Sequence, residues 1–128
     1  MANNGFLLDT TILIDLFRGR QEAIVFLDKL SQEGAFFVCA IVVSEIFSGV
    51  RPVELPKIEE FFEAMNYCPI DYRTARRAGL YRRDYQSKGI TLSISDTLVA
   101  AAAIEHSLTL VTKNVRHFPM SELSIIEH

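Results

Sequence analysis

Cysteine is scarce in this chain, which argues against stabilisation by disulfides or by a bound zinc ion. The two cysteines, Cys39 and Cys68, both lie in apolar surroundings. In a chain without an export signal, such residues are expected to be buried free thiols rather than a disulfide. Two cysteines alone cannot form a zinc site. The fold is therefore expected to rest on a hydrophobic core.

Long hydrophobic runs are also missing. The apolar stretches are too short for a transmembrane helix and are interrupted by Ser, Glu and Lys. The first residues, "MANNGFLLDTT", show no basic segment followed by an apolar one, so no signal peptide is expected. Hydrophobic residues make up 49% of the 128 residues. One domain spanning residues 1–128 is therefore expected, without linkers or repeats and with the cytoplasm as its location.

The net charge of −3 excludes a uniformly basic surface for nucleic acid. Residues 71–88 differ from the rest, because six cationic side chains face only two acidic ones, a local charge of +4. This basic segment either binds a polyanion or is a helix face exposed to solvent.

Strands and helices are expected to alternate along the chain. Strands are predicted at 4–9, 35–43, 67–71, 108–112 and 123–127, and helices at 10–19, 20–34, 44–50, 54–66, 72–89 and 95–107. Uniformly apolar strands between helices indicate an α/β fold, with a central, mostly parallel sheet covered by helices on both faces.

Three acidic residues fall at predicted strand-to-helix junctions. Asp9 ends the first strand, Glu45 lies in the first turn after the second strand, and Asp96 opens an alanine-rich helix. In a parallel sheet these junctions meet at one edge, where ligands bind. Three clustered carboxylates repel one another unless a cation lies between them. Ligation by oxygen alone suits Mg²⁺ or Mn²⁺, which typically act on phosphate groups.

Each acid also has a simpler interpretation. Asp9 and Asp96 could be ordinary helix caps, and Glu45 could turn out to water from its apolar run, "FFVCAIVVSEIFSGV". Asp15, on the first helix, is expected to face water.

The stretches "FLLDTTILIDLFRG", "VVSEIFSGV" and "SDTLVAAAAIEHSLTLVTKNVRHF", in this order, resemble the PIN-domain family, and within it the VapC-type toxins of toxin–antitoxin pairs. The resemblance runs from Phe6 to Phe118. It implies a single PIN-like domain with Mg²⁺- or Mn²⁺-dependent endoribonuclease activity. It also implies that Asp9, Glu45 and Asp96 are the catalytic and metal-binding acids. Its expected partners are an RNA substrate, a VapB-type antitoxin and a second copy of the chain in a homodimer.

The chain departs from the family where a fourth acid is often found, in the loop "TKNVRHF". Candidates for polar contacts with a second metal ion or the substrate are Thr10, Thr112, Asn114 and His117. Candidates for guiding the RNA backbone are Arg18, Arg82, Arg83 and Arg116. Phe61, Phe62 and Met65 exceed what one helix stripe needs, which suggests either an interface or a thick core.

Two other functions compete with this interpretation. A flavodoxin-like phosphoacceptor domain also gathers acids at strand ends, and Lys113 would suit it, but Asp9 has no acidic neighbour. A catalytically inactive PIN-like binding module fits the missing fourth acid but not the three acids that are present. Metal-dependent cleavage of RNA distinguishes the three functions.

Overall fold

Five short strands form one sheet, in the order β3-β2-β1-β4-β5, and every neighbouring pair is parallel. The computed structural model describes residues 5–128, so Asn4, in the predicted first strand, lies outside it. The strands are β1 Phe6–Leu8, β2 Phe36–Cys39, β3 Asn66–Cys68, β4 Thr109–Thr112 and β5 Ile125–Glu127. The helices are α1 Thr10–Phe17, α2 Gln21–Leu30, α3 Ala40–Ser48, α4 Leu55–Glu63, α5 Tyr72–Gln86, α6 Ile94–Glu105 and the short 3₁₀ helix η1 Val115–His117.

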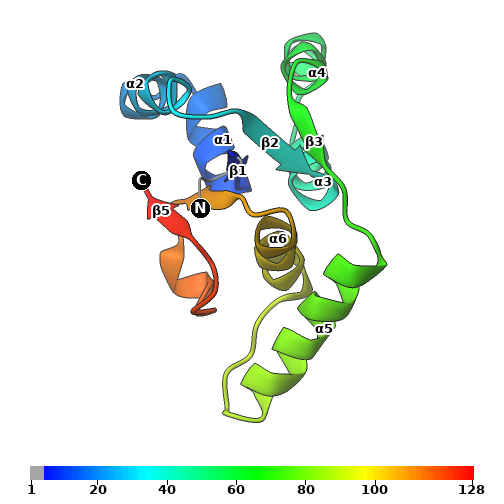
Figure 1. Cartoon of the computed structure of the whole chain (residues 1–128). Coiled ribbons are helices and arrows are strands. Elements are labelled where there is room, and N and C mark those ends of the chain that lie inside the picture. Colours follow the sequence, from blue (N-terminus) through cyan, green and yellow to red (C-terminus); the bar gives the residue numbers. More distant parts are fainter. Residues whose placement is uncertain (1–4) are drawn as a thin grey trace.

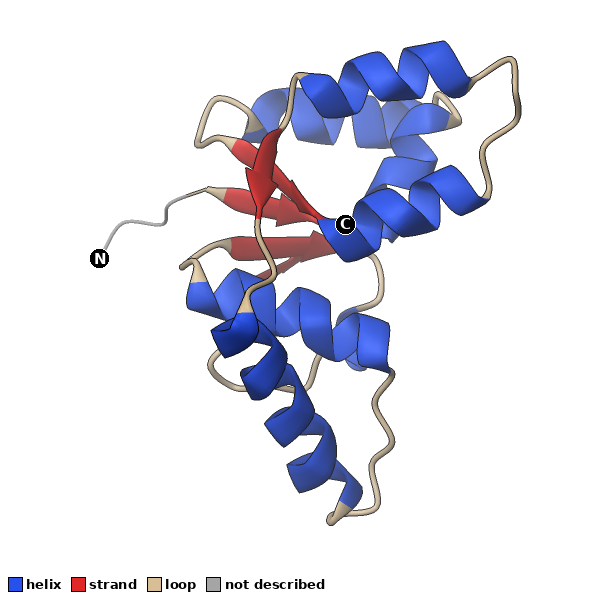
Figure 2. Cartoon of the chain, turned by 90° about the vertical axis from the view of Figure 1, so that its right-hand side faces the viewer, coloured by secondary structure: helices blue, strands red, loops and turns tan. Residues whose placement is uncertain are grey.

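Helices lie on both sides of the sheet, which confirms the predicted α/β architecture (Figures 1 and 2). The central strands β1 and β4 are buried along their whole length. Leu7, Leu8, Leu110 and Val111 have no exposed surface. Parallel strands are stable only with both faces covered, so this apolar centre fixes where the helices pack and where the strands end.

The apolar run at 35–43 is not one long strand. The strand ends at Cys39, and α3 begins at Ala40 rather than at Ser44. Val42 and Ile46, four residues apart, are the buried face of this helix. The predicted boundary is wrong because a continuous apolar run does not distinguish a buried strand from a buried helix. As a consequence, Glu45 lies in the second turn of α3, not in the first.

The alanine-rich helix α6 also begins earlier than expected. It begins at Ile94 rather than at Ser95, and its N-cap is Ser93, whose hydroxyl accepts a hydrogen bond from the Asp96 backbone N–H at 3.0 Å. Asp96 still lies in the first turn. The segment 100–103 consists of four alanines without exposed surface, and α5 packs against α6 (Figure 1).

Both cysteines are free and buried, as predicted. Cys39 and Cys68 lie opposite each other on the neighbouring strands β2 and β3. Burial raises the pKa of the Cys68 thiol to about 12, so this thiol stays protonated and unreactive at neutral pH. Within residues 5–128, no helix has the length and apolar character needed to cross a membrane.

Candidate active site

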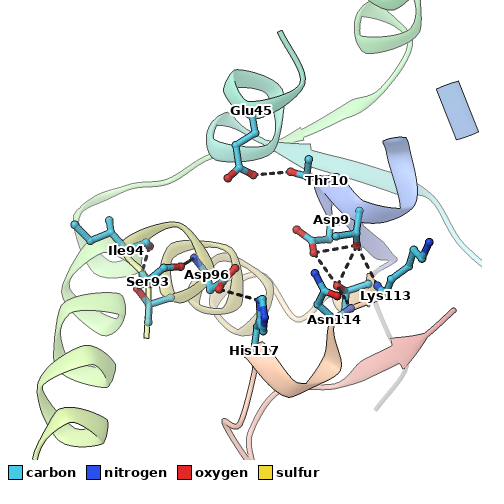
Figure 3. A network of polar contacts seen from close by, with 12 residues as sticks. Asp9, Thr10, Glu45, Ser93, Ile94, Asp96, Lys113, Asn114 and His117 are labelled. Carbon is cyan, nitrogen blue, oxygen red and sulfur yellow. Dashed lines mark hydrogen bonds and ion pairs between the residues drawn. The ribbon is translucent and has the colours of Figure 1, made fainter. Parts of the chain in front are cut away.

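The carboxyl edge of the sheet brings Asp9, Glu45 and Asp96 to one region of the molecule. Asp9 directly follows β1, Glu45 comes from α3 after β2, and Asp96 comes from the first turn of α6. Figure 3 shows the three side chains around the same space, with Asn114 and His117 below them. Asp9 and Glu45 follow strands, as the strand-end rule predicts. The prediction that Asp96 lies at a strand-to-helix junction is wrong, because α6 follows α5 and the loop of residues 87–93, which contains no strand.

Asp9 is the buried member of the group, with 7% of its surface exposed. Its Oδ2 accepts hydrogen bonds from the hydroxyls of Thr112 at 2.7 Å and Thr11 at 3.3 Å. Burial raises the pKa of Asp9, and the negative charge of Asp96 raises it further, while the hydroxyl groups act in the opposite direction. The two carboxylates are thus close enough to repel each other, and a cation near them would relieve that repulsion.

Glu45 is exposed, so its carboxylate pays no burial cost despite its apolar sequence neighbours. Its Oε1 accepts a hydrogen bond from the Thr10 hydroxyl at 2.6 Å. Glu45 also lines a hollow of about 220 Å³ together with Arg18. The exposed face of α3 therefore directs Glu45 away from the core and toward the strand edge.

Asp96 faces the loop after β4, and residues 112–118 include no acid. Its Oδ2 lies 3.4 Å from Nδ1 of His117, which comes from η1 (Figure 3). The backbone N–H of Asn114 donates to the Thr112 hydroxyl at 3.0 Å, and this hydroxyl in turn holds Asp9. Each of the four polar candidates in the sequence, Thr10, Thr112, Asn114 and His117, thus contacts an acid directly or through Thr112.

Within residues 5–128, no three His, Cys, Asp or Glu side chains are arranged closely enough to hold a metal ion between them. Glu45 turns toward Thr10, and Asp96 turns toward His117. The donors nevertheless fit a hard divalent cation in kind, since they are carboxylate oxygens with hydroxyl groups beside them. Side-chain rotation of Glu45 and Asp96 would be needed to bring them onto a common ion.

The expectation that Asp15 faces water is wrong. Asp15 is buried and accepts from Nζ of Lys113 at 2.6 Å, with Nε of Arg20 at 3.2 Å. The Lys113 backbone N–H also donates to the Thr11 hydroxyl at 3.0 Å. These contacts tie the loop after β4 to α1. The signal missed was the spacing of Thr11 and Asp15, four residues apart on one helix face.

The four arginines predicted to guide RNA lie in different surroundings. Arg18 lines the same hollow as Glu45, and Arg116 is exposed on η1. Nε of Arg82 donates to the backbone carbonyl of Leu92 at 3.1 Å. Arg83 pairs with its neighbour Asp84 at 3.1 Å. Arg18 and Arg116 are thus the two that lie beside residues of the carboxylate region.

Comparison with known proteins identifies a family and several relatives. The family described as "PIN domain" matches residues 6–121. Ribonuclease VapC19 of Mycobacterium tuberculosis is 39% identical over 115 residues, which cover 89% of this chain and 92% of the relative. Ribonuclease VapC10 of the same species is 31% identical over 116 residues, covering 91% and 87%.

Solved structures share the fold. VapBC2 from Rickettsia felis, bound to a DNA fragment from its promoter, aligns with a TM-score of 0.84 at 21% identity, covering 97% of this chain and 98% of that one. A toxin–antitoxin complex from Klebsiella pneumoniae aligns with a TM-score of 0.78 at 27% identity, covering 94% of each chain.

The buried contact of Asp15 predicts a pH-dependent effect of Asp15→Asn on stability. The hydrogen bond and charge of Lys113 lower the pKa of Asp15 in the folded state. A carboxylate with a depressed folded pKa contributes stability above its unfolded pKa, and this contribution is lost as the pH falls through the folded pKa. Asp15→Asn should therefore lower the free energy of unfolding by about 1–3 kcal/mol at neutral pH.

Urea denaturation over a series of pH values measures this effect, with the exposed Asp28→Asn on α2 as the control. The control should change stability by no more than about 0.5 kcal/mol. The deficit of Asp15→Asn should shrink in acid. A deficit that is absent, or that stays constant down to acid pH, would refute this role for Asp15.

Proposed function

Because the chain belongs to the PIN-domain family, we propose that it is an endoribonuclease and acts as the toxin of a VapC-type toxin–antitoxin pair. The observation that carries this proposal is the match to ribonucleases along nearly the whole chain, combined with three acids at one sheet edge. The substrate would be RNA, hydrolysed at a phosphodiester bond. The cytoplasm, as the expected location, remains a prediction.

We assign Asp9, Glu45 and Asp96 as the ligands of Mg²⁺ or Mn²⁺. A bound ion of this kind supplies a more acidic water molecule and offsets the charge of the phosphate group. The chain's own part is to position the carboxylates. Thr112 and Thr11 hold Asp9, and Thr10 holds Glu45. Cationic groups of Arg18 and Arg116 would bind the RNA phosphates beside these acids.

The family match leaves little support for a phosphoacceptor domain. That function would need Lys113 free to contact a phosphoryl group, whereas its Nζ is paired with Asp15 at 2.6 Å. A binding module without catalysis is the remaining alternative. It differs from the proposed nuclease in one measurable property, the metal-dependent cleavage of RNA.

The proposed protein partners are an antitoxin and a second copy of the chain. A groove of about 850 Å³ is lined mainly by apolar side chains from α1, α4 and the residues just after α4, among them Leu16, Phe17, Phe61 and Met65. Phe17, Phe61 and Phe62 also contact one another edge to face. The aromatic surplus on α4 thus serves the core and still leaves apolar surface open for a partner segment.

Removing any one carboxylate should abolish catalysis without unfolding the chain. Asp9→Asn, Glu45→Gln and Asp96→Asn should each reduce metal-dependent cleavage by more than the ~10–100-fold typical of residues that only support a metal ligand. Asp9→Asn should also stabilise the metal-free protein at neutral pH. Burial raises the pKa of Asp9, and ionisation above that pKa costs stability.

RNA gel assays and thermal melts of the purified variants measure both effects, with the exposed Glu59→Gln on α4 as the matched control. Unfolding of these conservative variants would mean that the acids are structural. Cleavage that survives all three substitutions would exclude this site.

A divalent ion should stabilise the native protein through the same acids. Binding to the folded state alone adds about 2.7 kcal/mol when the ion is present at about 100 times its dissociation constant. Mn²⁺ should therefore raise the melting temperature of the wild type more than that of Asp96→Asn in the same buffer. Equal shifts in the two proteins would place the ion elsewhere.

The apolar groove should be needed for antitoxin binding, and the chain should be a homodimer. Ala64 is exposed and lines the groove, so Ala64→Glu places a charge there without disturbing the core. This variant should lose co-purification with the antitoxin, whereas Val25→Glu, at an exposed position on α2, should keep it. Unchanged co-purification of Ala64→Glu would exclude the groove as the binding surface.

Sedimentation of the chain alone tests the dimer, and a monomer at micromolar concentration would exclude it.

A further inference from the structure

A pocket lined by arginines lies on α5 and the end of α6, apart from the carboxylate region. Its volume is about 340 Å³, and Arg73, Arg76, Arg77 and Glu105 are among the residues that line it. Glu105 follows Asp96 by nine residues on α6. At 100° and 1.5 Å per residue, the two acids lie on opposite faces of the helix, about 13 Å apart along its axis. Helix α6 therefore separates this pocket from the proposed cleavage site.

Glu105 orients two of the arginines. The Glu105 side chain is 13% exposed, and its carboxylate accepts from Nε of Arg77 at 2.5 Å and lies 3.5 Å from Nε of Arg73. Nε is the inner edge of a guanidinium group, so both terminal nitrogens of Arg73 and Nη2 of Arg77 remain outside these contacts. Nη1 of Arg77 donates to the Tyr81 hydroxyl at 3.4 Å, and that hydroxyl donates to Glu122 at 2.9 Å. Holding the side chains in place in advance lowers the entropy lost when they bind an anion.

An exposed aromatic ring lies beside these cations. Tyr72, the first residue of α5, is 80% exposed. Tyr72 and Arg76 are four residues apart, as are Arg73 and Arg77, so each pair is adjacent on the helix surface. The first two turns of α5 therefore carry an aromatic ring beside Arg76, with Arg73 and Arg77 paired on the adjoining part of the helix surface. Arginines that bind phosphates and an aromatic side chain on which a base stacks are the usual means of holding single-stranded RNA.

We propose that Tyr72, Arg73, Arg76 and Arg77 form a second RNA-binding surface, the α5 anchor, which holds an unpaired part of the substrate away from the cleavage site. The arginines contact backbone phosphates through their free terminal nitrogens, and Tyr72 stacks on a base. This inference rests on the proposed ribonuclease function and extends it. An acidic protein segment would also bind the arginines, but the large exposed ring of Tyr72 favours a nucleic-acid base.

The anchor also suits the charge of the whole chain. A net charge of −3 gives the chain as a whole no attraction for a polyanion, so RNA binding requires a place where cations are concentrated. Glu105 and Asp84 line the same pocket, and their negative charges limit the attraction of RNA phosphates to the arginine side chains themselves. Binding should therefore depend on a few contacts that can be removed one at a time.

Equilibrium binding of a fluorescein-labelled, mixed-sequence single-stranded RNA tests the anchor. The parent protein carries Asp96→Asn, which prevents cleavage, and divalent metal is omitted. In this parent, adding Arg73→Gln and Arg76→Gln together should weaken binding. The slope of log affinity against log salt should also fall by about 1.4, since each phosphate contact on a single strand contributes about 0.7. Arg77 is left in place because its contacts support the packing of α5 on α6.

Tyr72 requires a separate pair of substitutions. Tyr72→Ala should weaken RNA binding by about fivefold or more, the lower end of the cost of losing one base stack. Tyr72→Phe retains the ring and should bind RNA as the parent does. Equal losses in the two variants would contradict stacking.

The matched control for charge is Lys29→Gln combined with Lys57→Gln, because both lysines are exposed and lie on α2 and α4. This control should keep the parent's affinity within about twofold and its salt slope within about 0.3. If substitution of the two arginines lowers RNA affinity and the salt slope no more than substitution of the two lysines does, the anchor is refuted. Retained RNA binding together with lost binding of a poly-glutamate peptide would overturn it in favour of an acidic protein partner.

The two proposals fail in different ways. If the wild type cleaves RNA with Mg²⁺ but the α5 variants bind RNA normally, only the anchor is wrong. If RNA binding depends on the α5 residues but the wild type cleaves no RNA, only the nuclease proposal is wrong. Sedimentation of each variant should show the parent's oligomeric state. A changed state would make α5 a contact between copies and would overturn the anchor.

Discussion

The burial of Asp9 depends on the parallel pairing of β1 with β4. Because Leu8 pairs with Val111, the residue after β1 lies beside Thr112 at the end of β4, and the Thr112 hydroxyl donates to the Asp9 carboxylate at 2.7 Å. Without that donor, the buried Asp9 side chain would lose its shortest hydroxyl contact and keep the longer one from Thr11, at 3.3 Å, in a region of low dielectric constant. The other side chains of the site take their places around this contact. Lys113 and Asn114 follow Thr112 directly, and both return hydrogen bonds to the threonines that hold Asp9.

Much of the fold and part of the candidate site could be predicted from the sequence. Apolar strands alternating with helices indicated the parallel sheet, and its carboxyl edge predicted that Asp9 and Glu45 lie in one region. Asp96 joins them from the start of α6, which follows the helix α5 and not a strand. The details that failed depend on tertiary contacts. The start of α3 was misplaced because "AIVV" satisfies both strand and helix patterns, and only the burial of Val42 and Ile46 distinguishes them. The spacing of Thr11 and Asp15 puts both on one face of α1, but the partner of Asp15 is Lys113, 98 residues away, which no local pattern identifies.

The molecule carries two separate groups of charges, the acids at the sheet edge and the arginines of α5. At the strand edge, Asp9 and Asp96 repel each other, and this stored repulsion favours a divalent cation. On α5, arginines held by Glu105 keep terminal nitrogens available for an anion. Phosphate contacts contribute affinity without sequence choice, whereas an unpaired base stacked on Tyr72 would restrict binding to single-stranded segments. Cleavage and substrate placement would thus be assigned to opposite faces of α6.

The central claim is that Asp9, Glu45 and Asp96 hold one metal site. Anomalous diffraction from a crystal grown with Mn²⁺ tests it most directly, because the signal locates the ion independently of any activity. The account predicts an anomalous peak at coordination distance from the carboxylates of Asp9 and Asp96, with Glu45 and Asp96 turned from Thr10 and His117 toward the ion. A peak at other acids, such as Asp84 and Glu105, with none beside Asp9, would contradict it.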